Sequence, residues 1–228
     1  MTPKINSNFK YGFTLAEVLI TLIIIGVIAA FTIPTLINNT KKQEYVAGLK
    51  KAYSLLSNAT NAVMYEEGNP RCDIGGWACG NTRVATLLKK HLSVSRDCGR
   101  AWNYECFEQG RFKTLAGGLA NNNWSMFGSS PYKMVLNNGM QLVIGDSRSD
   151  CTYGIWGQTG IENMCIMMIM DINGSKGPNT LGRDIFYFAI KEYGLVPAGH
   201  DVESSCSSSS SYGGSCANRV LRENAMNY

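Results

Sequence analysis

A polar loop in the last third of the chain carries oxygen-bearing side chains at close spacing. Five of them could converge on a hard cation such as calcium, which prefers carboxylate and amide oxygens: Asp171, Asn173, Ser175, Asn179 and Asp184. The run is not an EF-hand, because its glycine is at the fourth position rather than the sixth and Gly182 stands where the bidentate glutamate should be. The alternative is a structural turn in which Asn and Asp side chains bond the backbone. The structural turn is the favoured prediction, and calcium is the other one.

Eight cysteines form the second set of reactive groups. All lie after position 71, and none is in a C-x-x-C spacing, which argues against zinc and thioredoxin-type chemistry. Such a set is typical of an oxidised compartment. The simplest prediction is pairing in chain order, with free thiols in a core as the alternative. The predicted pairs are Cys72 with Cys79, Cys98 with Cys106, Cys151 with Cys165, and Cys206 with Cys216.

The sequence offers little for catalysis or for nucleic-acid binding. Its two histidines, His91 and His200, exclude a histidine-rich metal centre. No Ser/His/Asp arrangement, phosphate-binding loop or catalytic carboxylate pair can be singled out. The formal charge of +4 is too small and too dispersed to indicate nucleic acid as a partner. The chain is therefore predicted not to be an enzyme and, calcium aside, to need no cofactor.

The elements that position these groups begin with an apolar run near the amino terminus. Residues 1–12 are polar, and the chain is almost continuously apolar from Phe13 to Ile37. A helix of this length spans roughly 35 Å, enough to cross a bilayer core of about 30 Å. A secretory signal peptide is the rival interpretation, but the polar stretch 38–42 is a poor cleavage site. The run is thus predicted to be retained as a membrane span.

An acidic residue, Glu17, lies five positions into this run. An ionised carboxylate costs at least a few kcal/mol in a membrane unless it reaches water close to the helix start. The string Gly12-Phe13-Thr14-Leu15-Ala16-Glu17 resembles the processing site of type IV prepilins and type II secretion pseudopilins. The short basic leader, the Gly-Phe junction, the Glu and the apolar helix follow in the same order. Pro34 also lies where many members of that family kink the first helix, and the resemblance covers roughly residues 1–65.

The resemblance implies a processing and assembly pathway. A prepilin peptidase would cut between Gly12 and Phe13 and methylate the new amine of Phe13. Glu17 would then pair with a positive amine, its own or a neighbour's, and low dielectric makes that pairing far stronger than in water. Pro34 lacks an N–H, so a kink or local melting is expected there. The implied partners are like or related pilin subunits, the peptidase/methyltransferase and an inner-membrane assembly platform.

The helix is predicted to continue beyond the membrane as an amphipathic element. Apolar residues recur at helical spacing from Tyr45 to Val63, and the helix should end near Tyr65. A short helix with a polar cap at Asn81-Thr82 should follow. The stretch 93–131 reads as loop-rich. Four strands are predicted, with a hairpin at Asn138-Gly139: 132–136, 140–144, 164–172 and 184–191.

These predictions define an α+β fold. A long amino-terminal membrane-spanning helix packs on a small antiparallel sheet, as in pilins, with a disulfide-bonded head. Three segments follow: a leader at 1–12, a helix at 13–65 whose first half is transmembrane, and an extracytoplasmic head at 66–228. Lysines flank the span on both sides, so the positive-inside rule gives a weak orientation. The cysteines favour a single-pass inner-membrane protein with its head outside the cytoplasm.

The leading functional prediction is a structural subunit of a type IV pilus-like or type II secretion pseudopilus filament. The alternative is a minor pilin that acts as a binding module in adhesion or DNA uptake. Its candidate contacts are a serine-rich loop closed by Cys206 and Cys216, and six scattered basic residues: Lys89, Lys90, Arg96, Arg100, Arg111 and Lys113.

Overall fold

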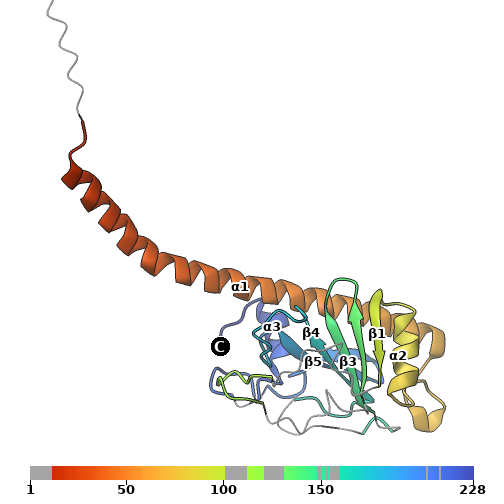
Figure 1. The fold of residues 1–228 in the computed structure, drawn as a ribbon. Coiled ribbons are helices and arrows are strands. Elements are labelled where there is room, and N and C mark those ends of the chain that lie inside the picture. Colours follow the sequence, from red (N-terminus) through yellow and green to blue (C-terminus); the bar gives the residue numbers. More distant parts are fainter. Residues whose placement is uncertain are drawn as a thin grey trace, which may run out of the picture. The chain divides into compact units, whose positions relative to one another are not determined.

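The computed structural model describes residues 12–100, 112–120, 131–147, 150–152, 154, 160–203, 205–210 and 212–228. The chain divides into two compact units, Met1–Lys41 and Lys42–Tyr228. The second unit is called the head below, and most of its helices and strands are labelled in Figure 1. The boundary between the units lies inside one long helix, so each unit is described by itself.

That long helix, α1, extends over Leu15–Glu67 and ends within two residues of the predicted position. It is continuous through Pro34, so the local melting expected there is not seen. The hydroxyls of Thr32 and Thr35 donate to the carbonyls of Ile28 and Phe31, four residues earlier on the same helix. Hydroxyl groups in an apolar helix are thereby satisfied without solvent.

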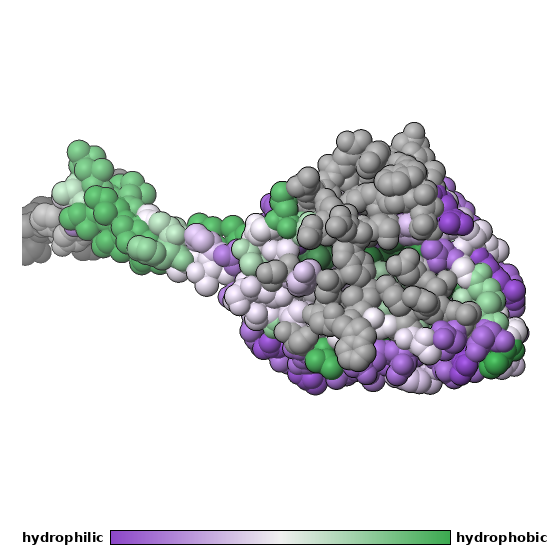
Figure 2. Space-filling model, turned by 90° about the horizontal axis from the view of Figure 1, so that it is seen from below, coloured by the Kyte–Doolittle hydropathy of each residue, from purple (hydrophilic) through white to green (hydrophobic). Residues whose placement is uncertain are grey.

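The first part of α1 is long and apolar enough to cross a membrane, by its length and composition. Its large apolar side chains are exposed; Leu15 is 78% exposed and Phe31 is 76% exposed. Figure 2 shows this part of the chain in green, the colour of hydrophobic residues. A continuous apolar surface of this kind needs a lipid bilayer or other helices to cover it.

The described part of the head forms a six-stranded antiparallel sheet in the order β1-β2-β3-β4-β5-β6. The structure confirms the predicted α+β class, with four of the strands near the predicted positions. The sheet has two more strands than predicted, one at each edge. The bounds are Val94–Gly99 (β1), Tyr132–Leu136 (β2), Gln141–Ser147 (β3), Ile166–Asp171 (β4), Ile185–Lys191 (β5) and Gly194–Pro197 (β6).

The head part of α1 packs on this sheet through its apolar face. The ring of Tyr53 stacks on that of Phe188 in β5, with centroids 6.4 Å apart. Strands β4 and β5 are buried along their whole length, as continuous apolar runs at the centre of a sheet should be. The predicted amphipathic face of α1 is confirmed by its buried residues, which include Val46, Leu49, Ala52, Leu56, Ala59 and Val63.

Two short α-helices and a 3-10 helix, Cys72–Ile74, also lie in the described part of the head. Helix α2 (Asn81–Lys89) contacts β2 and β3, and α3 (Cys216–Glu223), which was not predicted, contacts β5. The predicted polar cap of α2 is wrong, because the helix begins at Asn81, two residues earlier than expected. Gly80 is its N-cap, without a side-chain cap bond, and Asn81 already lies inside the helix.

A polar contact at the end of β5 joins segments that precede and follow this strand in the chain. Lys191 Nζ is 2.7 Å from Asp201 Oδ2, and the same oxygen accepts the backbone N–H of Glu162 at 2.8 Å. His200 Nδ1 lies 2.8 Å from the other carboxylate oxygen. Partial burial raises the pKa of Asp201, but the hydrogen bonds from Lys191 and the other two groups outweigh it and hold the pKa at about 2.

Asp201→Asn is expected to lower the free energy of unfolding by about 1–3 kcal/mol near neutral pH, because the largely buried Lys191 ammonium loses its carboxylate. Folding lowers the pKa of Asp201, so its contribution is fully present above about pH 4 and is lost as the pH falls toward the folded value. Denaturant unfolding of the full chain in detergent, at neutral and acidic pH, checks this. A wild-type-to-variant difference that stays constant down to low pH would contradict it.

Candidate functional site

The first turn of α1 contains a reciprocal set of hydrogen bonds between Thr14 and Glu17. The carboxylate oxygen Oε2 of Glu17 accepts the backbone N–H of Thr14 at 2.8 Å and its hydroxyl at 2.9 Å. The hydroxyl oxygen of Thr14 in turn accepts the backbone N–H of Glu17 at 3.2 Å. With Thr14 as N-cap, Glu17 is the third residue of the helix, and the pair forms a capping box.

Sequence reasoning missed this capping role of Glu17, although the signal was present. The spacing Thr14-x-x-Glu17 before an apolar run is the capping-box pattern. The box turns the carboxylate back toward the helix start, one residue from Phe13. A cleavage before Phe13 would place its new amine at this end of the helix. The negative charge of Glu17 also interacts favourably with the helix dipole there.

The predicted cleavage junction is open in the structure. Gly12 and Phe13 are both exposed, and Phe13 precedes the first helical residue. A side-chain carbon added at Gly12 would meet nothing within 4 Å. The fold of the described chain therefore does not require glycine at this position.

A comparison with protein families decides what this terminus is. The family described as the prokaryotic N-terminal methylation motif matches residues 8–33. The chain carries the hallmark of type IV pilin and pseudopilin precursors. No curated protein and no solved structure matches the chain. The prepilin motif implies processing by prepilin peptidase and assembly with other pilins, and so a membrane-anchored structural subunit rather than an enzyme.

Three disulfides join pairs of described cysteines in chain order: Cys72–Cys79, Cys151–Cys165 and Cys206–Cys216. The predicted partner of Cys98 is Cys106, which lies outside the described residues.

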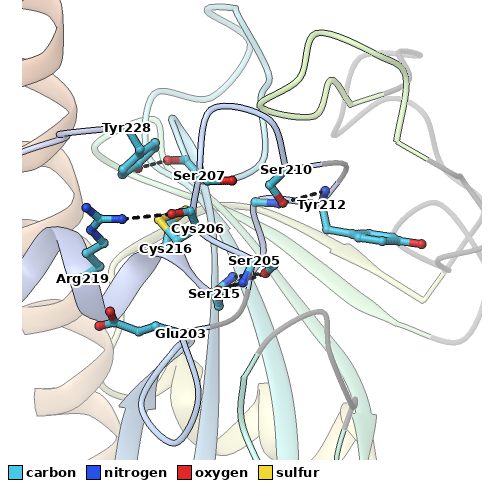
Figure 3. Close-up of a disulfide and its surroundings, with 12 residues drawn as sticks. Glu203, Ser205, Cys206, Ser207, Ser210, Tyr212, Ser215, Cys216, Arg219 and Tyr228 are labelled. Carbon is cyan, nitrogen blue, oxygen red and sulfur yellow. Dashed lines mark hydrogen bonds between the residues drawn. A yellow bond between two sulfur atoms is a disulfide. The ribbon is translucent and has the colours of Figure 1, made fainter.

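The last of these disulfides closes the serine-rich loop, as Figure 3 shows. Arg219 Nη1 donates to the carbonyl of Cys206 at 3.0 Å, and the buried hydroxyls of Ser205 and Ser215 lie 2.9 Å apart. The loop is thus held at its base by both covalent and polar contacts.

The loop from Asp171 to Asp184 is organised by its two carboxylates, both buried. Asp171 Oδ1 accepts the backbone N–H groups of Asn173 at 3.1 Å and Gly174 at 2.9 Å. Gly174 has φ of 65° and approaches the carbonyl of Gly139 so closely that a side chain would not fit. This is the Asx-turn geometry expected of the structural interpretation.

Asp184 bonds the other half of the loop. Its carboxylate accepts the N–H groups of Asn179 at 2.8 Å and Thr180 at 2.6 Å, and the amide of Asn173 at 3.3 Å. Burial raises the pKa of Asp184 and outweighs these hydrogen bonds, which lower it. Burial, with a smaller effect of the Asp184 charge, raises the pKa of Asp171 to about 7. The structure therefore brings Asp171, Asn173, Asn179 and Asp184 together.

Calcium binding in this loop stays a prediction. The amide oxygens Asn173 Oδ1 and Asn179 Oδ1 are buried without a hydrogen-bond partner, which suits a cation ligand. Ser175, by contrast, is exposed, and both carboxylates already accept backbone donors. The described residues contain no group of three acidic, histidine or cysteine side chains that could hold a metal ion.

Under the structural-turn interpretation, millimolar calcium or excess chelator is expected to move the melting temperature of the full chain in detergent by less than about 1 °C, because nothing binds the folded state selectively. Differential scanning fluorimetry checks this. A rise of several degrees with calcium, removed by Asn179→Ala, would instead show that the loop holds the ion.

The basic residues named for a DNA-binding head do not all present free charge. Lys89 Nζ is 2.5 Å from Asp97 Oδ2, and Lys90 Nζ is 4.0 Å from Glu67 Oε1. Arg111 lies outside the described residues. The described part of this set gives no support to a continuous basic surface.

Proposed function

We propose that this protein is a structural subunit of a type IV pilus-like or type II secretion pseudopilus filament. The observation that carries the proposal is the prepilin motif at the start of an exposed apolar helix that also packs on a folded head. The subunit would have a single-pass inner-membrane anchor, with its head outside the cytoplasm and an assembly platform as partner.

The mechanism is mechanical. Removal of residues 1–12 frees the amine of Phe13, and Glu17 pairs with that amine or with the amine of a neighbouring subunit. The apolar half of α1 then leaves the bilayer for the filament core, where helices of other subunits cover its exposed surface. Burial of apolar area and one charge pair in low dielectric both favour the assembled state.

A minor pilin that acts as a binding module in adhesion or DNA uptake is the second candidate. The observation in its favour is the loop that follows Cys206, where Ser207, Ser208 and Ser209 are exposed at the end of a disulfide-pinned base. Loops rich in Ser, Tyr and Gly are frequent in binding surfaces. In this case, loop variants would change binding while filaments still form.

The mature chain is expected to begin at methylated Phe13, and intact mass with N-terminal analysis of the protein from its native membrane checks this. Gly12→Glu is expected to retain the leader, because a bulky charged side chain replaces the small residue at the peptidase junction. A chain that begins after about position 38 would mean ordinary signal cleavage and would overturn the filament proposal.

A further inference from the structure

Tyr65 is an aromatic side chain on α1 with almost no contact to its own head. It is 93% exposed, more than any other large apolar side chain described in the head. It lies two residues before the end of α1, at the end of the head helix that is remote from Lys42. An aromatic ring held in water on a rigid helix is the kind of residue that anchors an interface.

A cavity of about 280 Å³ lies at the other end of the head part of α1. The cavity is partly open to solvent, so a side chain from another molecule can enter it. Its volume exceeds that of an enclosed cavity of about 150 Å³ that accepts benzene in another protein, so an aromatic ring is not too large for it. It lies between α1 and the loop after β4, and its lining is Glu44, Tyr45, Ala47, Gly48, Lys51, Ile172 and Asn173.

We propose that Tyr65 of one copy of this chain inserts into this cavity on the next copy. The contact joins two different surfaces of the same molecule, which is a heterologous interface, and repetition of such an interface gives an open helical filament when the rotation does not close. The inference therefore deepens the proposed filament function and rests on it. Tyr65 and five of the seven residues that line the cavity lie on α1, the helix through which the subunit is proposed to assemble.

The chemistry of the two surfaces is complementary. Ile172 gives the cavity an apolar lining. It packs closely against Gly48, where an added side-chain carbon would lie 3.0 Å from Ile172 Cδ1. Glu44 in its lining can accept the phenol O–H, which a buried tyrosine needs to bond. Lys51 in the lining is opposite in charge to Glu66, the neighbour of Tyr65.

The contact also fixes a spacing. Ala47 in the cavity lining precedes Tyr65 by eighteen residues on one helix, which is five turns or about 27 Å. When head helices of contacting copies are parallel, those copies are offset by about 27 Å along the filament.

A cysteine pair tests the contact in filaments of the full chain. Tyr65→Cys together with Ala47→Cys is expected to give a ladder of intersubunit disulfides after mild oxidation, and either single variant alone none above wild type. The matched control combines Tyr65→Cys with Ser54→Cys in place of Ala47→Cys, because Ser54 is exposed on the same helix. This control pair should give no ladder.

Filament yield gives the second readout. Tyr65→Ala is expected to lower it at least about 10-fold, while Tyr193→Ala, 66% exposed, leaves it unchanged. This contact alone would be overturned if the wild type forms filaments, Tyr65→Ala has the wild-type filament yield and the cysteine pair gives no ladder. Correct processing at Phe13 with no wild-type filament would overturn the proposed function and this contact with it.

Discussion

Glu17→Gln is expected to abolish filament assembly while the leader is still removed and the chain stays in the membrane. Glutamine at this position can keep the capping box with Thr14, because its amide oxygen accepts the same N–H and hydroxyl donors. The variant therefore removes the negative charge and little else. The amine of Phe13 is then left without a partner in low dielectric, which costs about 3 kcal/mol or more. That corresponds to at least about a 100-fold loss of assembled subunits.

Thr14→Ala is the matched control for the charge effect. It removes the N-cap hydroxyl, worth about 1 kcal/mol, but retains the carboxylate. Assembly should fall by less than about 10-fold. Counting of filaments by electron microscopy, with intact mass to confirm the cleavage, checks both variants. Equal losses in Glu17→Gln and Thr14→Ala would contradict the charge pairing and assign Glu17 to helix capping alone.

Asp184→Ala is expected to cost at least about 3 kcal/mol of the free energy of unfolding. Its fully buried carboxylate bonds the N–H groups of Asn179 and Thr180 and the amide of Asn173. The substitution leaves the N–H groups of Asn179 and Thr180 without an acceptor and removes one of the two bonds of the Asn173 amide. Each unsatisfied buried group costs about 1–3 kcal/mol. Denaturant unfolding of the full chain in detergent measures the effect.

Asp73→Ala is the control for this loss. Asp73 forms a 2.6 Å ion pair with Arg71 on the surface, and exposed pairs contribute about 0–1 kcal/mol. The two variants should thus differ by at least about 2 kcal/mol. If Asp184→Ala unfolds at the same denaturant concentration as Asp73→Ala, the loop is not organised by its carboxylate.

The sequence predicted those parts of the fold whose signal is local and periodic. The turn at Asn138-Gly139 placed β2 at its observed bounds, and the apolar runs of β4 and β5 identified the two fully buried strands. Strand β1 was missed because it lies at the sheet edge, where Ser95, Arg96 and Asp97 are not alternately buried. The four-residue β6 is too short for a periodic signal.

The candidate sites also differ in how local their sequence signal is. The prepilin motif could be recognised because its residues are contiguous. The direction of the Glu17 carboxylate was missed, although the spacing Thr14-x-x-Glu17 is that of the capping box seen in the structure. In the loop from Asp171 to Asp184, the residue types allowed both a cation site and a turn. The backbone donors that fill the carboxylates become visible only in three dimensions.

The capping box at Thr14 and Glu17 has a consequence for how such a chain can diversify. All three of its hydrogen bonds span three residues, so none depends on the sequence of the head. The amino-terminal segment therefore forms its helix cap without any contact to the residues of the head. That independence agrees with the family match, which covers residues 8–33 and none of the head.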